Sequence, residues 1–250
     1  MKIYIIFVLS LTILFSCDPN NSGKLPPPQQ VQMVEKLTDL SEIERGIDTV
    51  PDRDGIYIEW YLLADPDVTS YNIYRKLKSE TIFSKIATIP VENVISPFDS
   101  TFSYIDDDNI VLDNSQNVYY YYVTATNRDG VEGSAPDSLT ENHYLLYSKP
   151  QTENHPDINA QDQPVFRWRF QGIIPDNYII RIENQVTENL IWIRKIRIVD
   201  YVPDQTKDLS TIANPPEFQP QSIYRWRIDT VGPDSLFSGS ESNWKSFLVN

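Results

Sequence analysis

Three aromatic residues in the first half of the chain recur in the second half, in the same order and at nearly the same spacing. The matched pairs are Trp60 with Trp168, Tyr71 with Tyr178, and Tyr119 with Tyr224. The three offsets are 108, 107 and 105 residues. A shared order at a nearly constant offset indicates an internal repeat. The sequence therefore predicts two copies of a unit of roughly 100 residues.

The first unit contains short stretches in which apolar and polar residues alternate. They lie at 55–60, 71–75, 84–89, 101–106 and 118–127. Clusters of Pro, Asp, Asn and Gly separate them, and alternation closed by such turn residues is typical of an all-β sandwich. Residues 31–46 fit both an alternating and a helical spacing, and we interpret them as a first strand that leads into an irregular crossing.

These stretches resemble a bacterial fibronectin type III domain from Pro28 to about Ser138. In that resemblance Ile58-Glu-Trp60 fits the second strand and the tyrosine-rich stretch fits the sixth. Its inward positions are Tyr119, Tyr121, Val123 and Ala125, with Tyr119 as the candidate for the tyrosine corner. Residues 150–250 resemble the same superfamily more loosely, and their fifth strand is not evident between Tyr201 and Phe218. The resemblance implies two tandem fibronectin type III-like sandwiches, at 28–149 and 150–250.

The first residues of the chain resemble the signal of a bacterial lipoprotein. Residues 2–16 hold one Lys and then an apolar run, shorter than the ~20 residues of a membrane span, that ends before the only cysteine. The quartet Leu14-Phe15-Ser16-Cys17 resembles the lipobox, in which cleavage leaves an acylated cysteine. It implies a signal peptide at 1–16, a lipid attachment site carrying palmitate or similar chains at Cys17, and a flexible tether at 17–27.

This resemblance implies a protein anchored to a membrane of the bacterial cell envelope through acylated Cys17. We expect the outer membrane rather than the inner one, and both the periplasmic and the surface face stay open. The alternative interpretation is an ordinary secretory signal, which would leave Cys17 as a free thiol.

The composition and the motifs argue against several functions. A net charge of −14 argues against binding to nucleic acid, and a single Cys excludes an internal disulfide and a thiolate-rich zinc or iron–sulfur site. No nucleophile elbow, phosphate-binding loop or His-Glu-x-x-His motif occurs. We interpret the two histidines, His143 and His155, as solvated residues near the junction of the units. The sequence predicts no catalytic residue, no metal and no cofactor.

One acidic cluster, Asp106-Asp-Asp-Asn109, is rich in the oxygen ligands that calcium prefers. It departs from the EF-hand pattern, because apolar residues follow it and the glycine is missing. We interpret it as a solvated turn, with calcium binding as the alternative.

The second unit carries arginines at alternating positions of its strands. Because Trp226 is expected to face the core, Arg225 and Arg227 point outward, and Arg181 of the neighbouring strand shares their face. Arginine forks suit carboxylates and phosphates, so these three residues form a candidate interaction face for an acidic glycan or protein. The alternative is pairing across strands with Glu183 or Asp229, or plain solvation of the arginines.

The stretch 190–199 is apolar at first and mixes in Arg and Lys later. Such a strand is either covered on both faces or presents an apolar patch rimmed by charge. Trp192 is the candidate contact to a partner or to the first unit, and burial inside the chain is the alternative.

These features favour a non-enzymatic, lipid-anchored envelope protein that acts as a protein-binding, adhesion or scaffold module. The alternative is a glycan-binding surface lipoprotein, which requires exposed aromatic rings, whereas the sequence assigns most of the 15 tyrosines to the core. An enzyme is a distant third interpretation.

Overall fold

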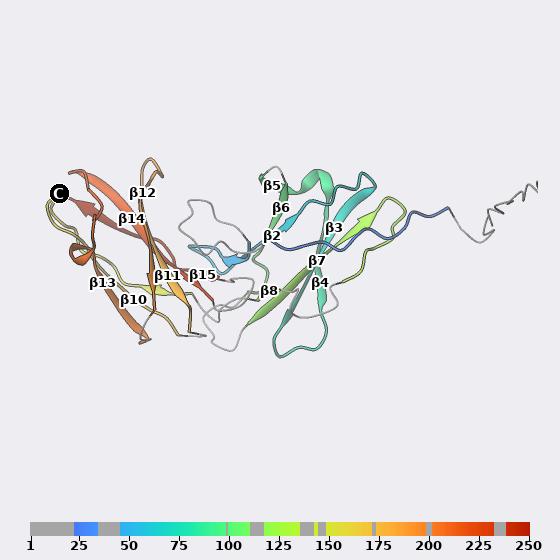
Figure 1. Ribbon diagram of the computed structural model, residues 1–250, viewed down its shortest axis with the longest axis horizontal. Helices are drawn as coiled ribbons and strands as arrows, with labels where there is room; N and C mark the ends of the chain where they lie inside the picture. Colours follow the sequence, from blue (N-terminus) through green and yellow to red (C-terminus); the bar gives the residue numbers. More distant parts are fainter. Residues whose placement is uncertain are drawn as a thin grey trace, which may run out of the picture.

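The computed structural model describes residues 23–34, 46–98, 100–110, 118–135, 143–144, 149–171, 174–198, 202–232 and 239–250. These residues form antiparallel strands, with two short 3-10 helices, η1 (Val91–Asn93) and η3 (Leu209–Thr211). Within these ranges no α-helix occurs. The fold class is therefore all-β, as the alternation in the sequence predicts (Figure 1).

Two four-stranded antiparallel sheets form the first sandwich. One sheet has the order β1 (Asp48–Thr49), β2 (Ile56–Tyr61), β6 (Thr101–Asp106), β5 (Ile95–Phe98). The other has the order β4 (Ser84–Pro90), β3 (Val68–Leu77), β7 (Tyr119–Asn127), β8 (His143–Tyr144). This division of the strands between two sheets is that of an immunoglobulin-like sandwich. The inward positions expected on β7 are all buried in one core with Trp60.

The second sandwich repeats this division of strands. One sheet has the order β13 (Asp204–Asp208), β10 (Val165–Arg169), β9 (Gln151–Thr152). The other has the order β12 (Leu190–Arg197), β11 (Asn177–Asn184), β14 (Ser222–Val231), β15 (Gly239–Glu241), and β16 (Lys245–Val249) also pairs with β14. The strand that the sequence left unplaced is β13, which occupies an edge and consists entirely of polar residues.

The aromatic residues of the repeat occupy equivalent places in the two sandwiches. Trp60 and Trp168 lie on β2 and β10, Tyr71 and Tyr178 on β3 and β11, and Tyr119 and Tyr224 on β7 and β14. All six are buried. The Tyr224 hydroxyl accepts a hydrogen bond from the Gln219 N–H at 2.8 Å, the backbone contact of a tyrosine corner. The repeat in the sequence is therefore a repeat of structure.

The expected first strand near residue 31 is reduced to a single bridge. Met33 pairs with Trp60, and the Val34 N–H donates to the Glu59 carbonyl at 3.0 Å. The remainder of that segment, 35–45, lies outside the described residues.

The two sandwiches lie end to end, with the C-terminus at the far end of the second one (Figure 1). The first described residues run along the first sandwich. The Leu25 N–H donates to the Asp129 carboxylate at 2.7 Å, at the turn that follows β7. This turn lies at the end of the first sandwich away from the second (Figure 1).

Candidate functional site

The two sandwiches are joined by hydrogen bonds between the β1–β2 corner of the first and the β15–β16 corner of the second. The Thr49 hydroxyl accepts a hydrogen bond from the Glu241 N–H at 2.7 Å and lies 3.1 Å from the Ser240 hydroxyl. These three residues are buried. Buried hydrogen bonds in this junction would have to be broken without compensation from water if the sandwiches moved apart slightly, so they favour one orientation.

A second pair of contacts extends the junction to its rim. The Asp52 N–H donates to the Asn243 side-chain oxygen at 3.1 Å, and the Trp244 N–H donates to the Asp52 carboxylate at 3.2 Å. Asp52 has a φ of 64°, in the left-handed region that Asp tolerates better than most residues. Its turn therefore presents both a donor and an acceptor to the second sandwich.

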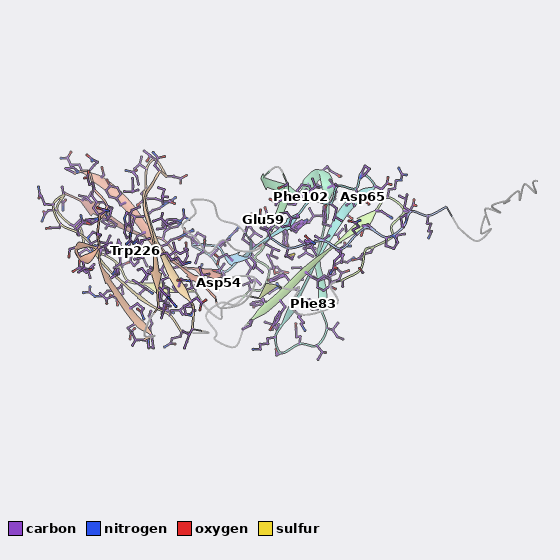
Figure 2. The ribbon with its side chains drawn as sticks, viewed as in Figure 1. Asp54, Glu59, Asp65, Phe83, Phe102 and Trp226 are labelled. Atoms are coloured by element: carbon purple, nitrogen blue, oxygen red, sulfur yellow. The ribbon has the colours of Figure 1, made fainter. Side chains whose placement is uncertain are left out.

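Lys149, in the segment between the sandwiches, closes the same junction. Its ammonium group donates to the carbonyls of Val50 at 2.6 Å and Arg53 at 2.8 Å. Burial lowers the pKa of Lys149, and nearby carboxylates led by Asp54 oppose that shift. Figure 2 shows Asp54 between the two sandwiches. We call Thr49, Asp52, Lys149, Ser240, Glu241, Asn243 and Trp244 the junction.

The candidate face of Arg181, Arg225 and Arg227 begins next to this junction. In the register of β11 and β14, Arg181 lies opposite Arg227, and Glu183 lies opposite Arg225. Trp226 is fully buried in the core (Figure 2). This register places the three arginines on one face of the sheet, opposite the core residue Trp226.

This face is not open, contrary to the expectation from alternation alone. Arg181 and Arg227 are only 5% and 4% exposed. Arg227 lies 2.7 Å from a Glu241 carboxylate oxygen and 3.0 Å from an Asp229 oxygen. Arg225 donates twice to Glu183, at 2.7 and 2.9 Å. The interpretation of pairing across strands is therefore the one that matches the structure.

A tryptophan that sequence reasoning did not place on this face covers it. The Trp244 ring lies 4.5 Å from the Arg225 guanidinium and 4.8 Å from that of Arg227. Cation–π contacts of this kind stabilise a guanidinium away from water. Glu241 then connects the arginines to the junction, because its side chain binds Arg227 and its backbone binds Thr49. The arrangement is suited to holding the second sandwich in place against the first.

Trp192 lies on β12 opposite Ile182 and is half-buried against the second core. This placement agrees with the interpretation that Trp192 is buried inside the chain, here against the core of the second sandwich.

The acidic cluster begins at the last residue of β6, and its first two carboxylates, those of Asp106 and Asp107, form ion pairs with arginines. The Asp106 carboxylate is 1% exposed and accepts from Arg75 at 2.8 Å and from the Tyr121 hydroxyl at 2.7 Å. Burial, followed by the Asp106 charge, raises the pKa of Tyr121. Asp107 pairs with Arg53 at 3.0 Å. In the parts of the chain that the structure describes, no three His, Cys, Asp or Glu side chains converge as metal ligands would.

His155 is not the solvated residue that the sequence suggested. Its Nε2 accepts from the Val165 N–H at 2.9 Å, its Nδ1 lies 2.6 Å from the Pro156 carbonyl, and its ring contacts Phe166 and Phe247. Burial lowers the pKa of His155, which favours the neutral ring. The His143 side chain lies outside the described residues.

The first sandwich carries an aromatic cluster on the outer face of β3 and β7, which we define as Tyr74, Phe83, Tyr120, Tyr122 and Lys76. The Tyr74 and Tyr122 rings are stacked with centroids 4.7 Å apart, and Phe83 meets Tyr122 edge-on at 4.7 Å. The Lys76 ammonium lies 4.9 Å from the Phe83 ring and 5.6 Å from the Tyr120 ring. All five side chains are half-buried (Phe83 is labelled in Figure 2).

Hydrogen-bonding groups border the aromatic cluster. The Tyr74 hydroxyl donates to Glu132 at 2.7 Å, and the Thr124 hydroxyl donates to the same carboxylate. Burial and the contact with Glu132 both raise the pKa of Tyr74. The cluster corrects the expectation that most tyrosines belong to the core. The rule that turns Tyr119 and Tyr121 inward also turns Tyr120 and Tyr122 outward.

Cys17 and the segments around it lie outside the described residues, so the lipid anchor stays a prediction. Across the described ranges, no helix has the length and apolarity needed to span a bilayer.

Comparisons with known proteins leave the family of this chain open. No family model matches the chain, and no curated protein matches it. Among solved structures, the chain is similar to the FN1–FN3 domains of chicken CNTN1, with 11% sequence identity and a TM-score of 0.35. That match covers 89% of this chain and 69% of the chicken chain. The assignment to immunoglobulin-like sandwiches therefore rests on the order of the strands in the sheets.

Proposed function

We propose that this chain is a non-enzymatic, lipid-anchored protein of the bacterial cell envelope, whose two sandwiches act as a stiff scaffold for binding a partner protein. In this proposal residues 1–16 are the signal peptide, 17–27 the tether, and 28–149 and 150–250 the two domains. The observation that carries the proposal is the hydrogen-bonded junction, since a spacer that only linked two modules would not need buried bonds between them.

The position of the segment that precedes the first sandwich supports the same proposal. Residues 25 and 26 lie at the end of the first sandwich away from the second. An anchor at Cys17 followed by an extended tether would allow about 30 Å between the bilayer and the first sandwich. The second sandwich would then be the part held farthest from the membrane. A stiff junction would keep its surfaces at a fixed distance and orientation.

The anchor is tested by metabolic labelling in a bacterial host with an alkyne analogue of palmitate. We expect the full chain to be labelled and to sediment with membranes, because the acylated cysteine supplies the apolar anchor. A Cys17→Ser variant should lose the label. Unlabelled, soluble full chain would contradict the anchor.

Protease treatment of intact cells that carry a C-terminal tag then separates a surface location, where the tag is lost, from a periplasmic one.

Glycan binding is a second candidate function, and the aromatic cluster of the first sandwich is the observation that favours it. Rings beside hydroxyl, carboxylate and ammonium groups match the alternating apolar and polar faces of a sugar.

Affinity electrophoresis in gels that contain a β-glucan, a xylan or a polygalacturonate tests this function. We expect retardation by at least one polysaccharide, which a Tyr74→Ala, Tyr122→Ala double variant abolishes because both stacking rings are lost. Tyr61→Ala is the matched control, since Tyr61 is an exposed tyrosine on the other sheet. Equal migration of the full chain in all gels would argue against glycan binding.

A further inference from the structure

Strand β12 forms an edge of its sheet. It pairs with β11 along one side, and no described strand pairs with its other side. Such an edge presents backbone N–H and C=O groups that a further strand can pair with. Its eight residues are long for an edge that no described strand covers, because natural edges are usually kept short.

A pocket of 260 Å³ lies between β12 and the segment that follows β13, at the rim where the two sheets of the second sandwich part. Its lining residues are Arg194, Lys195, Ile196, Lys207, Thr211, Ile212 and Ala213. Three of them are cationic and none is acidic. Ile196 and Ile212 pack against the second core, so the pocket joins an apolar base to a basic surround.

The charge of β12, which lines one side of this pocket, differs from that of the whole chain. The chain carries a net charge of −14, yet residues 190–198 hold two Arg and one Lys with no acidic residue. Arg194 is exposed and Lys207 is half-buried. Within the described residues, no carboxylate forms an ion pair with Arg194 or Lys207. The arginines beside the junction, in contrast, are bound to acids of the same sandwich.

We propose that the β12 edge and this pocket bind an acidic, extended segment of a partner protein, which joins the sheet as an additional strand. The inference deepens the proposed scaffold function and rests on it, because it gives the class of partner that the second sandwich holds. Main-chain hydrogen bonds to β12 would supply affinity, and every second side chain of the segment would face the pocket. Carboxylates at those positions would pair with Arg194 and Lys207.

The size of the pocket favours a peptide over a small organic ligand. Pockets that enclose such ligands usually exceed about 300 Å³ and bury most of the ligand. A smaller pocket beside a free strand edge suits one or two side chains of an extended segment. An anion that occupies the pocket without strand pairing is the competing result of the experiment below.

The probe is a fluorescent nonapeptide of alternating Glu and Val, titrated with the purified full chain in detergent micelles. We expect saturable binding that weakens as NaCl is added, and weaker or no binding of the matching Lys and Val peptide. An Arg194→Glu, Lys207→Glu double variant should raise the Kd about tenfold or more, because it reverses both charges that face the segment.

A Lys78→Glu, Arg128→Glu double variant is the matched control. It makes the same change in net charge on exposed residues of the first sandwich, and its Kd should stay close to that of the unmodified chain. Hydrogen exchange with and without the acidic peptide gives the second readout, and the amides of β12 should become more protected.

Three results would overturn the inference: no binding of the acidic peptide, equal weakening in both double variants, or binding without protection of β12. The last would mean that the pocket takes an anion and that the edge takes no strand. Failure of the inference is distinguishable from failure of the proposed function, because palmitate labelling and sedimentation of the full chain do not depend on β12.

Discussion

Replacement of Arg227 by Met is expected to lower the free energy of unfolding of the second sandwich by about 3–5 kcal/mol. Arg227 is 4% exposed and lies against Asp229 and Glu241, which are equally inaccessible. Met retains much of the apolar volume under Trp244 but removes the cation that both carboxylates face. Asp229 and Glu241 then remain buried close together without the guanidinium. This lowers the free energy of unfolding more than the loss of an exposed ion pair would.

Chemical denaturation followed by tryptophan fluorescence measures this loss. Arg225→Met is the matched control, because Arg225 also lies under Trp244 and also binds a carboxylate. Its side chain is 23% exposed, so water replaces part of the lost interaction and we expect a cost of about 1 kcal/mol. Equal losses in the two variants would show that burial of the acids does not set the stability of this face.

The strands that bury one face could be predicted from the sequence. In β2 and β7 the core takes every second residue, so Trp60 and Tyr121 had to belong to an alternating pattern. The same physics explains why β13 was missed. Its sequence, Asp-Gln-Thr-Lys-Asp, has no apolar residue, and it becomes a strand only because β10 offers it a pairing edge.

The arginine face shows where alternation stops being informative. The alternation of side chains along the strands correctly placed Arg181 and Arg227 on the side away from the core. It does not predict which residues cover them. Trp244, in the segment between β15 and β16, covers Arg227 and its neighbour Arg225. The arginines could therefore be found from the sequence, whereas the cover over Arg225 and Arg227 comes from a residue outside the strands and could not.

The junction left no recognisable pattern in the sequence. Thr49 and Ser240 are small polar residues, separated by 191 positions, that occur in turns for many reasons. A buried hydroxyl of this kind becomes significant only when its partner is known. The aromatic cluster is different, since Tyr120 and Tyr122 lie between residues already assigned to the core and were accessible to the same reasoning.

A Thr49→Ala, Asp52→Ala double variant is expected to release the two sandwiches from their fixed orientation while each sandwich stays folded. It removes the Thr49 contacts to Ser240 and Glu241 and the Asp52 contact to Trp244. At about 1 kcal/mol for each hydrogen bond, the variant weakens a polar junction, and domains move relative to one another unless their interface is large and hydrophobic. Neither residue belongs to either hydrophobic core, so the unfolding transitions should change little.

Pulsed electron paramagnetic resonance measures this release, with Cys17 replaced by Ser and spin labels on cysteines introduced at the exposed positions Lys78 and Glu188. The labels then report a distance between the sandwiches. We expect a narrow distance distribution for the parent chain and a broad one for the double variant.

A Thr69→Ala, Asp67→Ala double variant is the control, because it changes the same residue types in the first sandwich outside the junction. Its distribution should stay narrow.

If the distance distribution of the junction variant also stays narrow, the orientation does not depend on these bonds, and the scaffold proposal loses the observation on which it rests. If it broadens while the anchor and the β12 edge are unchanged, stiffness can be removed separately from attachment and binding. Loss of the envelope function in that variant would then assign the function to the fixed orientation itself.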